Sequence, residues 1–208
     1  MQAPEPMLID AGAVGQSETI LRSLAGLGVR PLDIKKIIIT HHHADHAGGL
    51  WELHKRSGAK LYAHINDADF IQGRKLRRAP RRGLSKMYHN AVSLIGSSEP
   101  RPVALDGKLR DGDEIAGLRV IHTPGHTPGH ICLLRGPVLF SGDLLEATAG
   151  RFSETPHAFT SDLATSRKSI RMIAKLEFTA ILSGHRPPYV IDANNKVREL
   201  AEKLGGWK

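Results

Sequence analysis

The 208-residue sequence lacks the features that mark secreted and membrane proteins. It contains one cysteine, Cys132, which cannot form an internal disulfide and so fits a reducing compartment. Cys132 lies in the apolar run 131–134, so we expect a core residue rather than a metal ligand or a nucleophile. No apolar run approaches the roughly 20 residues that a membrane-spanning helix needs, and no secretory signal opens the chain. These absences predict a cytoplasmic protein that does not enter the membrane.

The overall composition is ordinary for a globular protein. Hydrophobic residues make up 40% and charged residues 24% of the chain. No internal repeat of solenoid length is visible. The length suits one domain that covers residues 1–208.

The excess positive charge is concentrated in one segment, from Arg74 to Lys86, which contains no acidic residue. Its basic residues are Arg74, Lys75, Arg77, Arg78, Arg81, Arg82 and Lys86. Removing these seven charges from the formal net charge of +8 leaves +1 for the rest of the chain. The segment is either a solvated loop or a surface that grips the phosphates of a nucleic acid, and the sequence leaves both open.

One short tract, residues 40–49, carries four side chains that can bind a metal ion. They are His41, His43, Asp45 and His46, and they directly follow the apolar run 37–39. Imidazole and carboxylate groups are ligands that a divalent ion such as zinc takes. One small ion cannot easily take all four from a single short loop, so the tract predicts two metals. Because it is neither terminal nor repetitive, a tag or a low-complexity segment is disfavoured.

Hydrophobic patterns on both sides of the tract predict alternating strands and helices. We expect strands at 7–10, 35–40, 59–64, 118–122, 130–134, 138–141 and 179–182, and helices near 17–27, 50–57, 85–95, 162–176 and 194–204. This order indicates an α/β layered architecture.

Three further metal-ligand candidates stand at or near the ends of other predicted strands. His126 lies between two Pro-Gly turns, whereas Asp143 and His185 each follow a glycine after an apolar strand. Loops collect at strand ends, so these residues would complete a site begun by the tract.

The combined pattern resembles the metallo-β-lactamase-fold superfamily, whose five motifs are matched in order along nearly the whole chain. Asp10 matches the acid of the first motif, the tract matches His-x-His-x-Asp-His, and the three later candidates match motifs three to five. The resemblance implies an αββα sandwich with two metals in a cleft at the sheet edges. Members usually have two strands before the first motif, whereas six residues precede Met7 here. We therefore expect a truncated or minimal member that lacks those first strands.

The resemblance also implies a division of the metal ligands. One ion would be held by His41, His43 and His126, the other by Asp45, His46 and His185, with Asp143 bridging both. Asp10 would orient ligands through hydrogen bonds. Two zinc ions are expected, with iron or manganese as alternatives.

Two zinc ions close together would generate a bridging hydroxide near neutral pH, which attacks a polarised carbonyl or phosphorus atom. Asp45 would take the water proton and pass it to the leaving group, so Asp45 and Asp143 are the catalytic candidates. No convincing serine or cysteine triad is found.

The substrate is less defined than the reaction. The segments 40–49, 122–130 and 142–143, the last followed by 150–152, look most like the glyoxalase II and small general hydrolase branch. That branch favours a small-molecule ester, thioester, lactone or lactam, anionic ones included. Against glyoxalase II itself, the chain ends soon after His185 and lacks the C-terminal helical region that binds glutathione there. His157 and Tyr189 are candidate substrate contacts, because they lie in loops after Asp143 and His185.

Other functions stay open. A nuclease or phosphodiesterase of the same fold would use the segment from Arg74 to Lys86 to bind phosphates.

A mono-iron persulfide dioxygenase shares the His-x-His-x-Asp-His and Gly-Asp pattern, so metal analysis is needed to separate it from a hydrolase. A non-catalytic binding role is least favoured because the ligand set is complete. A flavodiiron electron-transfer protein is disfavoured because His43 stands where an acid is expected.

Overall fold

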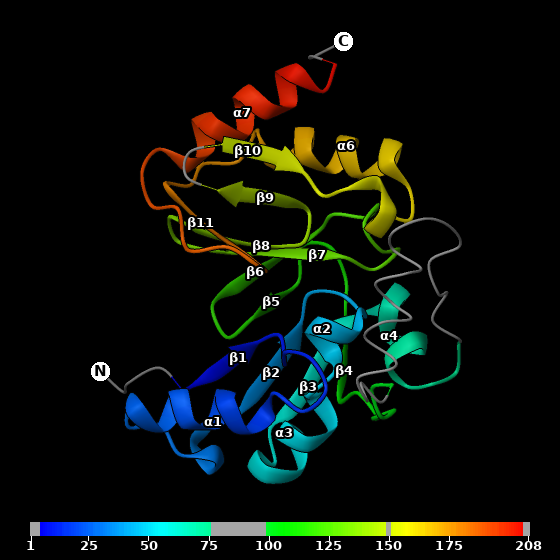
Figure 1. Ribbon diagram of the computed structural model, residues 1–208, viewed down its shortest axis with the longest axis vertical. Helices are drawn as coiled ribbons and strands as arrows, with labels where there is room; N and C mark the ends of the chain where they lie inside the picture. The colour runs from blue at the N-terminus through cyan, green and yellow to red at the C-terminus, as the bar shows by residue number, and fades with distance from the viewer. Residues whose placement is uncertain (1–4, 76–98, 149–150, 206–208) are drawn as a thin grey trace. The chain divides into compact units, whose positions relative to one another are not determined.

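The structure is a computed structural model that describes residues 5–75, 99–148 and 151–205 (Figure 1). The chain divides into two compact units, residues 1–109 and 110–208, and each unit has its own sheet. The single domain over residues 1–208 stays a prediction. Within the described ranges, no helix combines the length and the apolar character needed to cross a membrane.

The first unit is built on a parallel sheet with the strand order β1-β2-β3-β4. Its strands are β1 (Met7–Ile9), β2 (Lys36–Ile39), β3 (Lys60–His64) and β4 (Gly107–Leu109). Its helices are α1 (Ser17–Gly26), η1 (Pro31–Asp33), α2 (Ala44–Ala47), α3 (Leu50–Ser57) and α4 (Ile65–Ile71). Figure 1 shows α1 and α3 on the same side of this sheet.

The core of the first unit explains why β2 holds the candidate metal-binding tract in place. Ile37, Ile38 and Ile39 are each fully buried, as expected for a parallel strand that is covered on both faces. Ile37 and Ile39 share one hydrophobic cluster with Leu50 and Leu53 of α3. The tract begins where this rigid strand ends.

The second unit contains a five-stranded sheet with the order β11-β8-β7-β6-β5. Its strands are β5 (Glu114–Ile115), β6 (Leu118–His122), β7 (Ile131–Arg135), β8 (Val138–Gly142) and β11 (Ala180–Ser183). Neighbouring strands are antiparallel except for the parallel pair β8 and β11. A separate antiparallel hairpin consists of β9 (Leu145–Thr148) and β10 (Arg151–Glu154).

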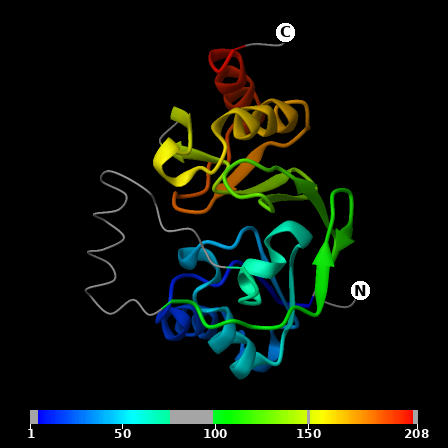
Figure 2. The same cartoon turned by 90° about the vertical axis from the view of Figure 1, so that its right-hand side faces the viewer.

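Two helices, α6 (Leu163–Ile173) and α7 (Ala193–Lys203), pack together in the second unit. Both views show them on the same side of the five-stranded sheet (Figures 1 and 2). Their buried residues Ile170, Ile173 and Val197 share a hydrophobic cluster with Leu139 of β8 and Ile181 of β11. Asp162 caps α6 by accepting a hydrogen bond of 3.1 Å from the backbone N–H of Thr165. The short 3-10 helix η2 (His157–Phe159) precedes α6.

The predicted strands and helices in the described residues are confirmed, with shifts of a few residues at their ends. Helix α4 and the hairpin of β9 and β10 were not predicted, because neither carries a long apolar periodicity. The helix expected at 85–95 lies outside the described residues, as does the segment 76–86 of the basic run. The expected lack of strands before β1 stays a prediction.

Candidate metal centre

In the first unit, the tract turns sharply from strand β2 into helix α2. His43 is the N-cap residue of α2, and Asp45 and His46 lie within this one-turn helix. Ligand atoms of His41 and His43 lie within 4.8 Å of each other, and the same holds for Asp45 and His46. His41 is fully buried and His46 is 3% exposed, whereas Asp45 is exposed. The local fold therefore gathers three imidazoles and one carboxylate within this unit.

Asp10, which follows β1, ties the end of β2 to helix α2. Its carboxylate accepts hydrogen bonds of 2.7 Å from the backbone N–H of Thr40 and of 2.8 Å from the Thr40 hydroxyl. It also contacts His46 Nδ1 at 2.8 Å. Asp10 has a left-handed backbone with φ of 65°, which an acid tolerates but which is uncommon outside glycine. The contact with Nδ1 leaves Nε2 of His46 as the nitrogen for a metal.

His42, between two ligand residues, is held by helix α4. Its ring stacks on Phe70 with centroids 4.2 Å apart, and its Nδ1 lies 3.0 Å from Asp67 Oδ2. Asp67 is fully buried and accepts a hydrogen bond of 2.9 Å from the backbone N–H of His42. Helix α4 thereby anchors the backbone of the tract from the side.

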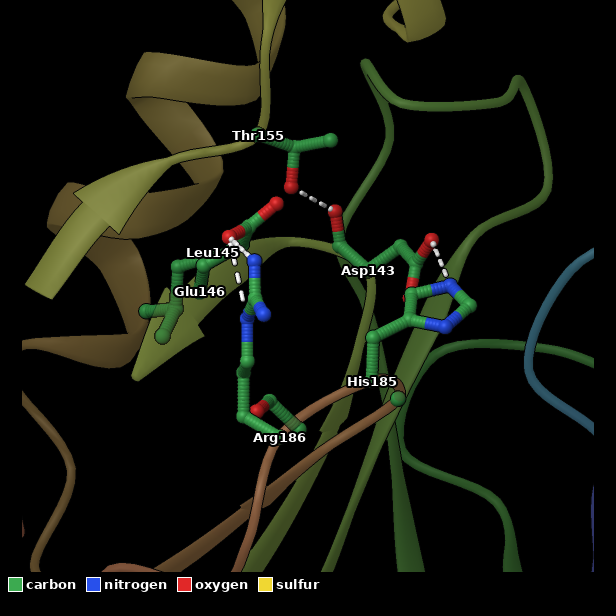
Figure 3. Close-up of a pocket in the computed structure, with 8 residues that line it drawn as sticks. Asp143, Leu145, Glu146, Thr155, His185 and Arg186 are labelled. Carbon is green, nitrogen blue, oxygen red and sulfur yellow. Dashed lines mark hydrogen bonds and ion pairs between the residues drawn. The ribbon is translucent and has the colours of Figure 1, made fainter. Parts of the chain in front are cut away.

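In the second unit, one carboxylate oxygen lies near two imidazoles. Asp143 Oδ2 is 3.2 Å from His185 Nε2 and 3.7 Å from His126 Nε2. Figure 3 shows the ring of His185 turned toward the carboxylate of Asp143. His126 is fully buried, while the side chain of His185 is 47% exposed. A register irregularity between Leu182 and Ser183 in β11 precedes His185, as is common beside functional sites.

The backbone of Asp143 is fixed by two neighbours. Its N–H donates to His130 Nε2 at 3.1 Å, and its carbonyl accepts from the Thr155 hydroxyl at 2.5 Å. His130 Nε2 is thus an acceptor, so its Nδ1 carries the proton and donates to Thr123 Oγ1 at 2.8 Å. These hydrogen bonds fix the backbone position from which the Asp143 carboxylate extends.

The other candidates are two residues predicted to contact the substrate and the start of the basic run. His157 is exposed in η2. Tyr189 packs edge-on against Phe152 with ring centroids 5.2 Å apart, beside the hydrophobic cluster. Arg74 and Lys75, the described start of the basic run, both form ion pairs with Asp69. Substrate contact by His157 and Tyr189 stays a prediction.

One polar pair next to Asp143 and His185 was not predicted. Arg186 donates to Glu146 from Nε and Nη2, and both residues line a small pocket with Asp143 and His185. Figure 3 shows this pair beside the ligand residues. Arg186 and Glu146 are 40 residues apart in sequence, so no local pattern signals the contact.

The candidate metal ligands in each unit, imidazole nitrogens and a carboxylate, suit a divalent ion such as zinc. Both units offer imidazole nitrogens beside a carboxylate, and the contact of His46 Nδ1 with Asp10 orients that ring as a candidate ligand. Thiolate is absent from the candidate set, because the thiol of Cys132 is fully buried and its burial raises its pKa to about 12.

Comparison with known proteins defines the family. Residues 5–185 match the metallo-beta-lactamase superfamily. A probable metallo-hydrolase of Bacillus subtilis is 30% identical over 95% of this chain and 82% of that protein. A hydroxyacylglutathione hydrolase of Aeromonas hydrophila is 33% identical over 92% of this chain, which spans 64% of that protein.

A solved structure described as a di-iron-bound form is also similar. It is 26% identical with a TM-score of 0.68, over 92% of this chain and 87% of that one. The chain therefore belongs to the metallo-beta-lactamase superfamily and is a metal-dependent hydrolase. The α/β fold of the metallo-β-lactamase type that the sequence predicts is confirmed.

Proposed function

We propose that this protein is a dinuclear hydrolase that cleaves an ester, thioester, lactone or lactam bond of a small molecule. The observation that carries the proposal is the position of Asp143 Oδ2, within 3.7 Å of His126 Nε2 and 3.2 Å of His185 Nε2. A single carboxylate oxygen between imidazoles of two different ligand sets suits a bridging ligand. One ion would be held by His41, His43 and His126 and the other by Asp45, His46 and His185, with zinc as the expected metal.

When bound, two such ions supply Lewis acidity that polarises the scissile bond and lowers the pKa of a water molecule. The protein supplies the remaining functions. Asp10 holds the proton of His46 at Nδ1, which keeps Nε2 available as a ligand. Asp45, an exposed carboxylate in the first turn of α2, would accept the proton of the attacking water and return it to the leaving group.

An acyl compound is the substrate class that the relatives favour. A hydroxyacylglutathione hydrolase is among them, although this chain spans 64% of its length. A phosphodiester remains the second candidate through the basic segment, of which Arg74 and Lys75 are described and engage Asp69. We also propose a cytoplasmic location, for which the single cysteine is the support.

The test combines metal content with turnover. Protein purified without added metal is analysed for zinc, iron and manganese, and assayed against esters, thioesters, lactones, a chromogenic lactam, phosphodiesters and RNA. Alanine at His41, His126 or Asp143 is expected to remove bound metal and turnover together. The matched control is His54→Ala, since His54 contacts the Ala59 carbonyl oxygen rather than a ligand residue.

Two results would count against the proposal. One is turnover retained by a metal-free Asp143→Ala variant. The other is bound iron together with oxygen consumption, which would favour the persulfide dioxygenase. A salt-sensitive preference for RNA would instead favour the nuclease.

A further inference from the structure

The pocket beside Asp143 and His185 contains a charged pair that the hydrolytic reaction does not require. Arg186 directly follows His185, and Glu146 lies on β9. Arg186 Nη2 donates to Glu146 Oε2 at 2.7 Å, and Arg186 Nε donates to the same oxygen at 3.2 Å. The two side chains are 43% and 30% exposed. Figure 3 shows the guanidinium and the carboxylate at the pocket next to the Asp143 and His185 side chains.

The geometry of this pair differs from that of a second pair in the same unit. Arg167 donates from Nε to Glu154 Oε2 and from Nη2 to Glu154 Oε1, each at 2.7 Å. That arrangement matches two donors to two oxygens, which is the favoured geometry for arginine and a carboxylate. Arg186 instead directs both donors to one oxygen of Glu146. Its guanidinium is therefore engaged less favourably than that of Arg167.

The weak geometry makes the pair exchangeable. A partly exposed ion pair contributes little to stability, so its loss costs little. The remaining pocket has a volume of only about 10 Å³, room for roughly one water molecule. A larger group can enter only if a side chain moves. The Glu146 carboxylate already occupies the position at which an anion would contact Arg186.

We propose that Arg186 selects substrates that carry a carboxylate or a similar anion near the scissile bond, and that Glu146 occupies its guanidinium until such a substrate arrives. This inference rests on the proposed hydrolytic function, because it assigns the substrate class of the same site. An incoming anion that accepts from both Nε and Nη2 would improve on the contact with Glu146.

The test compares two esters that differ by one charge: the p-nitrophenyl monoester of adipic acid and p-nitrophenyl hexanoate. For the metal-loaded protein, kcat/KM for the anionic ester is divided by kcat/KM for the neutral ester, and this ratio is the measured quantity. Arg186→Gln is expected to lower this ratio by about tenfold, because the anionic ester alone loses one charge-assisted interaction. Glu146→Gln, which removes the competing charge, is expected to raise it. Arg167→Gln serves as the matched control and leaves the ratio unchanged.

A binding measurement separates this inference from the hydrolytic function. Adipate is titrated calorimetrically into the metal-loaded protein, and Arg186→Gln is expected to weaken its binding by about tenfold while Arg167→Gln does not. If neither ester is hydrolysed, the hydrolase proposal loses its support and the adipate titration still decides the role of Arg186. An Arg186→Gln variant with unchanged adipate affinity and an unchanged ester ratio would show that the pair only joins strand β9 to the segment after β11.

Discussion

His41 and His46 each contact a neighbour through Nδ1: His41 meets the Thr40 hydroxyl at 3.1 Å, and His46 meets Asp10 at 2.8 Å. Both rings thereby direct Nε2 to the metal side. Thr40 joins the two contacts, because its hydroxyl also donates to Asp10. The histidine tract could be recognised from the sequence. The hydrogen bonds that link Thr40 to Asp10 could not, because they form only when the ends of β1 and β2 are adjacent.

A residue-scale prediction concerns Cys132. The thiol is fully buried and its pKa is raised to about 12 by that burial, with the Thr123 hydroxyl as a smaller opposing influence. Thiolate is the reactive form, so we expect no labelling of native protein by iodoacetamide at neutral pH and full labelling after unfolding in guanidinium chloride. Mass spectrometry measures both. Rapid labelling of the native protein would show that Cys132 is exposed or activated.

At the scale of elements, the loop that carries His126 lies against the first turn of α6. A Cβ atom added at Gly125 would stand 2.2 Å from the Ser166 backbone nitrogen, and Gly125 has a φ of +133°. The backbone N–H groups of Ser161 and Asp162 donate to the carbonyls of His126 and Gly125. The position of His126 therefore depends on a close approach that only glycine permits.

The corresponding prediction is that Gly125→Ala lowers the free energy of unfolding by about 2 to 4 kcal/mol, through backbone strain and steric overlap. Denaturant titration measures the change. Gly136→Ala is the control, since Gly136 also has a positive φ of +53° but no atom within 4 Å of its added Cβ. We expect it to cost about 1 kcal/mol. Equal effects of the two substitutions would contradict the importance of the contact with Ser166.

At the scale of the whole molecule, the proposed metal ions would couple metal loading to the stability of the fold. A metal that binds only the folded chain stabilises it by mass action, by about 2.7 kcal/mol at a metal concentration one hundred times Kd. For a chain of this size we expect the removal of each such ion by chelation to lower Tm by roughly 5 to 10 °C.

Calorimetry with and without a chelator checks this prediction. The shift should be restored by added zinc and should persist in His54→Ala. The Asp143→Ala variant should show a much smaller shift, since it lacks the carboxylate proposed to bridge the two ions. A metal-dependent shift of equal size in Asp143→Ala would argue that the metal binds elsewhere.

The sequence by itself determined the candidate ligand residues, the metal-dependent hydrolase class and most elements, because these depend on local patterns. The histidine tract is contiguous, and apolar runs such as 37–39 mark buried strands. Only the tertiary structure decided how the ligands are held. The contacts of His42 with Asp67 and of Arg186 with Glu146 join residues 25 and 40 positions apart. Such contacts arise from packing between elements, on which sequence periodicity carries no information. The first contact anchors the tract, and the second is the basis of the proposed substrate selection.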